Sequence, residues 1–221
     1  MKTNIISNIF MVVLMLFCLP VFSQNDDITL EKLMKTNNLR FAVGGGYAFK
    51  LEKPNDTGNR KSTNGLILDA DGQYFFNDSW GLGLNSNVHA FSTSLSEFAI
   101  PGKYINDYEE THRVFFFGPS IILKSEYRKF LWIGSIGVGP LYFMGNITVN
   151  GVEGKNNQTT DGYIASFSGE YKMDNKMGIG FKLSNTSGNI YRINHQGQTV
   201  KSEDKVLLSY YSFSIFLSLR T

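Results

Sequence analysis

Residues 39–51 read LRFAVGGGYAFKL, and their side chains alternate between two kinds with a period of two. Successive side chains point to opposite faces of a β-strand, so the stretch predicts a strand with one apolar face and one small or charged face. The apolar face would carry Leu39, Phe41, Val43, Gly45, Tyr47, Phe49 and Leu51. The other face would carry Arg40, Ala42, Gly44, Gly46, Ala48 and Lys50.

The three glycines at 44–46 first suggest a phosphate-binding loop. However, no GxGxxG or GxxxxGK[ST] pattern follows them, and neither does a helical pattern. A nucleotide site is therefore excluded. An inward Gly-x-Gly recurs in three later segments, which favours a role in wall geometry, where a narrow barrel bends or larger neighbours need room. The four pairs are Gly44/Gly46, Gly81/Gly83, Gly137/Gly139 and Gly178/Gly180.

The same alternation recurs seven more times along the chain. The segments are 66–76, 80–91, 114–124, 131–144, 163–173, 177–186 and 207–220. Strands of soluble sheets average roughly 5–6 residues, whereas a tilted membrane-spanning strand needs about 9–11. These longer segments predict an all-β fold, an eight-stranded antiparallel up-and-down transmembrane β-barrel.

The connections between the segments alternate in length. Short turns are predicted at 77–79, 125–129 and 174–176, and long polar connections at 52–63, 93–112, 146–161 and 187–205. This asymmetry is typical of an outer-membrane barrel with turns in the periplasm and loops outside the cell.

The apolar face is expected to point outward. An eight-stranded barrel has an interior only just wide enough for side chains, and large aromatics from every strand would not fit there. Aromatic girdles at the membrane interfaces are expected from Tyr47, Tyr74, Trp80, Trp132, Tyr142 and Tyr171. The alternative is a soluble sandwich with these aromatics in its core.

The N-terminus predicts export. Residues 1–23 combine the basic Met1-Lys2 start, the apolar run 9–19 and a cleavage point after Ser23, as in a secretory signal peptide. Residues 24–38 are expected to form a short periplasmic segment and residues 39–221 the barrel domain. A membrane anchor and a lipid-modified Cys18 are the weaker alternatives.

The segment GQYFFNDSWGLGL (72–84), with FFFGPSIIL (115–123) and IGVGPLYF (136–143), resembles the small outer-membrane β-barrel domain proteins common in the Bacteroidota. These are broadly similar to the OmpA and OmpX eight-stranded barrels. The resemblance covers roughly 39–221 and implies architecture rather than chemistry. The chain departs from many outer-membrane proteins because it ends FLSLRT and not in an aromatic residue.

A polar network is expected inside the lumen. Folding about the short turns sets Asp71 opposite Asn85 and Asp69 opposite Asn87, and makes Glu170 and Lys182 diagonal neighbours. The network comprises Asp69, Asp71, Asn85, Asn87, His89, Glu170 and Lys182. Paired charges filling a plugged lumen are favoured over a proton or ion path.

Catalysis is not expected. His89 would face inward and Ser92 outward, and His112 and His195 are placed in loops without a recognisable nucleophile. Metal-ligand spacings are absent from the sequence, so neither a metal nor another cofactor is predicted. The net charge of +2 gives no reason to expect a nucleic-acid partner.

Function is therefore expected in the loops. Phe98, Tyr104 and Tyr108 lie in a loop that could cover the mouth or bind a partner. The expected partners are outer-membrane lipid and lipopolysaccharide, in a role in envelope structure or surface interaction. Two alternatives remain: an accessory barrel subunit of an outer-membrane secretion or assembly complex, and, less favoured, a lipid A-modifying enzyme.

Overall fold

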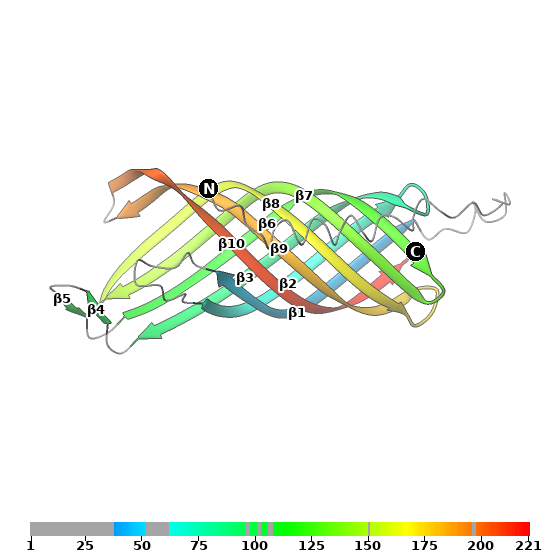
Figure 1. Ribbon diagram of the computed structural model, residues 1–221, viewed down its shortest axis with the longest axis horizontal. Helices are drawn as coiled ribbons and strands as arrows, with labels where there is room; N and C mark the ends of the chain where they lie inside the picture. The colour runs from blue at the N-terminus through cyan, green and yellow to red at the C-terminus, as the bar shows by residue number, and fades with distance from the viewer. Residues whose placement is uncertain are drawn as a thin grey trace, which may run out of the picture.

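The computed structural model describes residues 38–51, 62–95, 98–100, 103–105, 108–149, 151–195 and 198–221. The predicted signal peptide (1–23), and the predicted periplasmic segment except its last residue, lie outside the described residues. These ranges contain ten strands (Figure 1): β1 (Leu39–Leu51), β2 (Ser62–Phe75), β3 (Trp80–Leu95), β4 (Phe98–Ile100), β5 (Lys103–Ile105), β6 (Tyr108–Tyr127), β7 (Phe130–Val149), β8 (Val152–Lys172), β9 (Met177–His195) and β10 (Gln198–Arg220).

Eight of these strands form a closed antiparallel barrel in the order β1-β10-β9-β8-β7-β6-β3-β2. Each strand pairs with the next long strand along the chain, and β1 pairs with β10 to close the wall. The two short strands β4 and β5 form a separate hairpin between β3 and β6. The predicted fold class is thus confirmed. Among the described residues, no helix has the length and apolar character needed to cross a membrane.

Three of the long connections are shorter than predicted, because the strands continue into them. β7 and β8 stay paired up to Val149 and Val152, so the predicted loop 146–161 is wrong and forms a hairpin closed at Gly151. This glycine has a φ of 77°, the left-handed conformation that glycine adopts most readily. Likewise, β6 begins at Tyr108 and β9 runs to His195.

Two of the short turns use the same capping device. The side chain of Asn77 accepts hydrogen bonds from the backbone N–H groups of Ser79 (2.9 Å) and Trp80 (2.8 Å). The Asp174 carboxylate accepts from Lys176 and Met177, both at 2.7 Å. Asn and Asp favour turns for this reason, since they replace a missing backbone partner. These turns fix the registers of the β2–β3 and β8–β9 hairpins, which are those predicted.

The outer wall is apolar and exposed. Val43, Leu68 and Ile215 are 67%, 68% and 58% exposed, and most other outward side chains between the turns are equally apolar. In water such a surface would be a large uncompensated apolar patch. In a bilayer it is solvated by lipid, and the closed barrel has no edge strand whose backbone groups would face the lipid. The chain is therefore an outer-membrane β-barrel, with its short turns at one end (right in Figure 1).

The inner wall is layered along the axis. A small apolar cluster of Phe75, Ile122, Leu131 and Ile133 lies near the short turns. A larger one lies toward the long-strand end and comprises Ala48, Ile67, Phe91, Val114, Phe116, Leu141, Ile164, Leu208 and Tyr210. Most of the buried polar side chains occupy the level between them, whereas Glu170 and Lys124 lie at the level of the small cluster, opposite Leu131 and Ile133. The lumen thus contains large apolar residues as well as the small and charged ones expected on the inward face.

Candidate functional site

The centre of the lumen holds a buried cluster around Lys182 on β9. Its ammonium donates to both carboxylate oxygens of Asp71 at 2.8 Å and to Asp69 at 3.3 Å. Asn85 donates to Asp71 at 2.7 Å, and Asn87 donates to Thr186 at 2.9 Å. The three charged side chains are at most 6% exposed. Each buried charge therefore has an opposite partner, as burial requires.

A second ionic cluster lies nearer the short turns. Arg40 donates through Nε to Glu170 at 2.8 Å and through Nη1 to Gln73 at 2.7 Å. Its Nη2 lies 2.7 Å from the same carboxylate oxygen of Glu170. Arg220 pairs with the other oxygen of Glu170. One carboxylate thus serves two guanidinium groups.

The predicted register is confirmed, since Gly180 lies opposite Glu170 and Lys182 opposite Ser168, which makes Glu170 and Lys182 diagonal neighbours. Their ion pairs run to other strands, β1 and β10 for Glu170 and β2 for Lys182. The sequence-based set also omitted Arg40, Gln73 and Arg220. Their inward parity was the available signal, but parity does not tell which side chains meet across a lumen.

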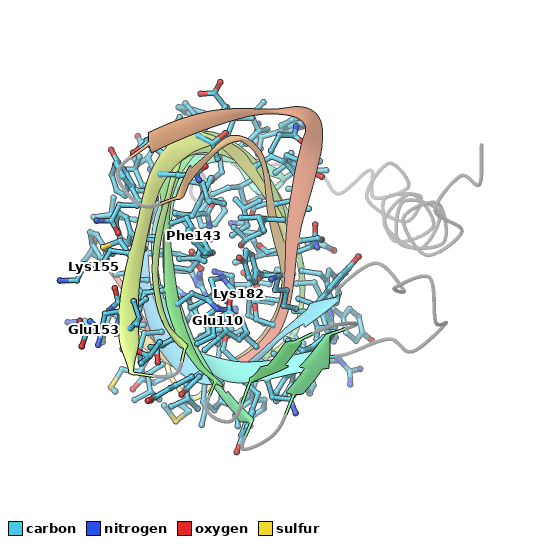
Figure 2. All side chains as sticks on the ribbon, turned by 90° about the vertical axis from the view of Figure 1, so that its left-hand side faces the viewer. Glu110, Phe143, Glu153, Lys155 and Lys182 are labelled. Carbon is cyan, nitrogen blue, oxygen red and sulfur yellow. The ribbon has the colours of Figure 1, made fainter. Side chains whose placement is uncertain are left out.

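An aromatic stack lies above the central cluster, toward the long-strand end. His89, Phe91 and His112 are buried, and the Phe91 ring stacks on His89 (centroids 6.2 Å apart) and on His112 (4.8 Å). His112 also stacks on Phe143 at 5.7 Å. His112 was expected in a loop; it lies inside the barrel because β6 begins four residues earlier. Figure 2 looks into this end and shows Phe143, Glu110 and Lys182 pointing inward.

The inward glycines lie where a neighbouring strand or side chain comes close. A Cβ on Gly44 would lie 2.8 Å from the Ile215 carbonyl, and one on Gly83 would lie 2.7 Å from Ile122. On β9, a Cβ at Gly178 would meet the Glu170 carboxylate, and one at Gly180 would lie 2.5 Å from the Phe216 ring. The remaining members of the four pairs, Gly46, Gly81, Gly137 and Gly139, are each confined by backbone of an adjacent strand.

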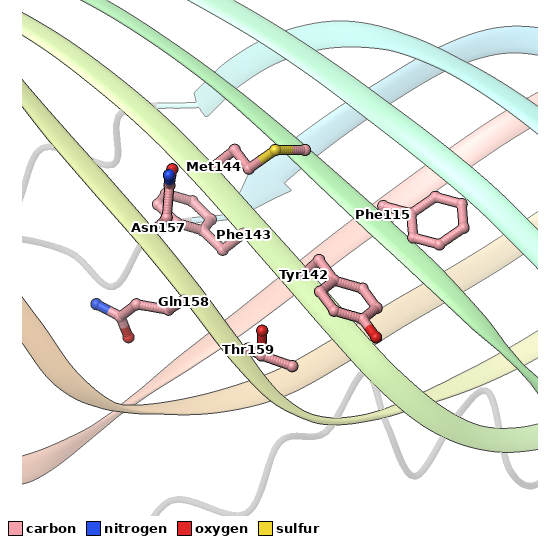
Figure 3. A pocket seen from close by; sticks show the side chains of 7 residues that line it. All are labelled: Phe115, Tyr142, Phe143, Met144, Asn157, Gln158 and Thr159. Carbon is pink, nitrogen blue, oxygen red and sulfur yellow. The ribbon is translucent and has the colours of Figure 1, made fainter.

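The six aromatic residues expected in girdles all lie on the outer wall: Tyr47, Tyr74, Trp80, Trp132, Tyr142 and Tyr171. Five are at least 40% exposed, and Trp132 stacks on Phe167. The side chains of the possible binding loop, Phe98, Tyr104 and Tyr108, lie outside the described residues. A shallow depression on the wall beside β7 and β8 (Figure 3) is lined by Phe115, Tyr142, Phe143, Met144, Asn157, Gln158 and Thr159.

Among the described residues, the buried charged side chains of the lumen form ion pairs across it. Within the described ranges, no three His, Cys, Asp or Glu side chains gather closely enough to hold a metal ion. His89 is fully buried while Ser92 is exposed, so they do not form a nucleophile–base pair. The arrangement is suited to blocking the lumen and cross-linking its walls.

Comparisons with known proteins bear on the fold. No family model and no curated protein sequence matches the chain. Among solved structures, a major outer-membrane protein from Thermus thermophilus is similar at a TM-score of 0.52 and 12% identity, covering 83% of this chain and 99% of that one. Neisserial surface protein A gives 0.49 and 11%, covering 84% and 98%. The outer-membrane protease OmpT from Escherichia coli gives 0.43 and 8%, covering 85% and 98%.

Proposed function

We propose that the protein is a non-conducting, non-enzymatic outer-membrane barrel that acts through the part of its wall above the bilayer, in envelope structure or surface interaction. The observation that supports this most directly is the filled lumen. Two apolar clusters and two ionic clusters occupy it, and the charged side chains of the two ionic clusters pair across the lumen rather than lining an open path. The segment 72–84 around the β2–β3 turn resembles the small outer-membrane barrels of the Bacteroidota, which supports a barrel of that type.

The wall itself is longer than a membrane requires. A spanning strand needs about 9–11 residues, whereas β8 has 21 and β10 has 23. Apolar outward residues on β8 end at Tyr163, and the preceding outward positions, Asp161, Thr159, Asn157 and Lys155, are polar and exposed or partly exposed. The strands therefore continue as a paired sheet beyond the lipid. Figure 2 shows Glu153 and Lys155 on the outside of this extension.

A second polar group supports the same boundary. On the outer face, Asn185 donates to Ser209 at 2.9 Å, Ser187 donates to the Asn185 amide oxygen at 3.0 Å, and the Ser187 and Ser209 hydroxyl oxygens also lie 3.0 Å apart. Asn185 lies directly opposite Tyr211 and Ser187 opposite Ser209, above the apolar pair of Leu183 and Phe213. Polar side chains that satisfy one another suit the headgroup region, where apolar contact with acyl chains ends. This level is where lipopolysaccharide would contact the barrel.

Conductance tests the plugged lumen. The purified protein is reconstituted in planar bilayers at neutral pH, with an open porin as the positive control for insertion. Heat-modifiable migration in electrophoresis first shows that the reconstituted protein is a folded barrel. At that protein concentration we expect no stable single-channel current. Large, long-lived and uniform conductance steps would overturn the proposal.

Lipopolysaccharide retention tests the external surface. Lys155→Gln is expected to reduce the lipopolysaccharide that co-purifies in mild detergent, because it removes a cation beside the anionic headgroups. Lys129→Gln is the matched control, since Lys129 is exposed in the short turn at the opposite end. Equal loss from both variants would contradict an external contact. Co-purification of a discrete protein complex would favour a subunit role instead.

A further inference from the structure

The inner wall at the short-turn end carries more positive than negative charge. Its inward-facing ionisable residues in the described chain are Arg40, Lys124, Glu126, Glu170, Lys172 and Arg220. Four are cations and two are carboxylates. Buried charge without a counter-charge is costly. The pairing of these six side chains therefore decides whether any buried cation at this end lacks an opposite charge.

Arg40 is held by protein partners through all three of its nitrogens. Nε and Nη2 contact the same oxygen of Glu170, and Nη1 donates to Gln73. The guanidinium also lies over the Phe216 ring, 5.1 Å from its centroid. Stacking and hydrogen bonding of this kind hold an arginine rigidly. Each nitrogen of Arg40 therefore already has a partner within the protein.

Arg220 has N–H groups that donate to no acceptor among the described residues. Its Nη2 pairs with Glu170, whereas Nε and Nη1 have no hydrogen-bond partner among the described residues. The side chain is only 7% exposed, so bulk water reaches little of it. Buried N–H donors without acceptors cost free energy that a bound acceptor would recover.

Lys124 supplies a second uncompensated cation. It is 7% exposed, and its ammonium lies 4.6 Å from the centroid of the Phe75 ring. In the described chain no carboxylate lies within ion-pair distance of it, although it interacts over a longer range with the carboxylates of Glu126 and Asp78 and with the cations Lys172 and Arg220. Glu126 is already paired with Lys172 at the rim, where both are partly exposed.

We propose that Arg220 and Lys124 bind a small oxyanion of the phosphate class at the periplasmic mouth of the lumen. The two surplus positive charges match a dianion, and a guanidinium beside an ammonium is suited to phosphate oxygens. The rim pair of Lys172 and Glu126 marks the side from which the anion enters. The phosphate could be free in solution or part of a phospholipid headgroup.

Inorganic phosphate is the first probe. The folded protein in an uncharged maltoside detergent is titrated by calorimetry and thermal unfolding at constant ionic strength, with chloride as the competing salt. The expected result is saturable binding and a higher unfolding temperature. Lys124→Met should lower the affinity about tenfold or more, since a hydrogen bond to a charged group is lost.

Lys176→Met is the matched control, because Lys176 is exposed at the same end and the substitution removes the same charge. It should leave the affinity unchanged. Lys124→Met keeps an apolar chain over Phe75, so heat-modifiable migration in electrophoresis should show that it still folds. Equal losses in the two variants would overturn the proposal, since binding would then follow net charge alone.

Dihexanoyl phosphatidic acid is the second probe and separates the two sources. Saturable binding of this soluble lipid without binding of inorganic phosphate, again lost in Lys124→Met, supports a headgroup site. Binding of inorganic phosphate supports a free anion. Saturable binding of neither probe overturns the proposal.

Discussion

Arg40 and Arg220 lie directly opposite each other on β1 and β10, the two strands that close the barrel. Like charges in opposed positions destabilise a sheet. Glu170, which reaches them from β8, pairs with both. The carboxylate that looks like a minor inward acid in the sequence is therefore what allows the barrel to close around two arginines.

Replacing this carboxylate should be costly. Glu170→Gln leaves two buried guanidinium groups facing each other without the carboxylate that pairs with both, and breaking a buried pair costs about 3–5 kcal/mol. Urea unfolding in detergent micelles measures the loss. Glu126→Gln is the control, because Glu126 is 43% exposed and an exposed ion pair is worth about 1 kcal/mol or less. Similar losses in both variants would contradict the bridging role.

Lys182 should be equally sensitive, for the opposite reason. Lys182→Met strands the two buried carboxylates of Asp69 and Asp71, with an expected loss of about 3–5 kcal/mol. The triple variant with Asp69→Asn and Asp71→Asn removes the stranded charge and should recover much of the stability in the same urea assay. A triple variant less stable than Lys182→Met would show that the carboxylates do not need the ammonium.

The glycine triplet offers a comparison within one strand. Gly46→Ala should impair folding, because the new Cβ would meet the backbone of Phe213. Gly45→Ala should be tolerated, since its Cβ points outward and first meets the flexible Leu68 side chain at 3.3 Å. The folded fraction is read from heat-modifiable migration in electrophoresis. Equal folded fractions for the two variants would show that the inward face has been assigned wrongly.

The β8–β9 turn should carry a pH-dependent part of the stability. Hydrogen bonds from the backbone of Lys176 and Met177 lower the pKa of Asp174 below its usual value. Such a group stabilises the fold above its unfolded pKa of about 3.9, and the contribution is lost as the pH falls through the lower folded pKa. Asp174→Asn should keep the turn, as Asn77 does in the β2–β3 turn, but lose this dependence. Urea unfolding at pH 7 and pH 3 compares the two proteins; an unchanged pH dependence would contradict the assignment.

Much of the barrel could be predicted from the sequence because one wall faces lipid and the other faces the lumen. Leu82 and Phe181 face the lipid, whereas the adjacent Gly83 and Lys182 face the lumen, so the alternation of residue types follows the two environments. Short turns then fix which residues face each other on adjacent strands, as with Asp71 and Asn85.

Two features could not be predicted in this way. Above the bilayer both faces of a strand are wet, so residues 152–161 lose their apolar alternation although their backbone stays paired with β7. The contacts across the lumen, such as Lys182 with Asp69, join strands that are not neighbours. Their geometry depends on how the barrel closes, which local patterns do not specify.

The ionic clusters also bear on the order of folding. Arg40 and Glu170 are 130 positions apart, and Lys182 and Asp71 are 111 apart. In an open sheet these side chains would be on strands that have not yet met, so the bonds form only after the last strand closes the wall. Interactions made after the transition state slow unfolding without speeding folding. We therefore expect the ion pairs inside the lumen to lower the unfolding rate of the barrel, so that a barrel once formed persists longer.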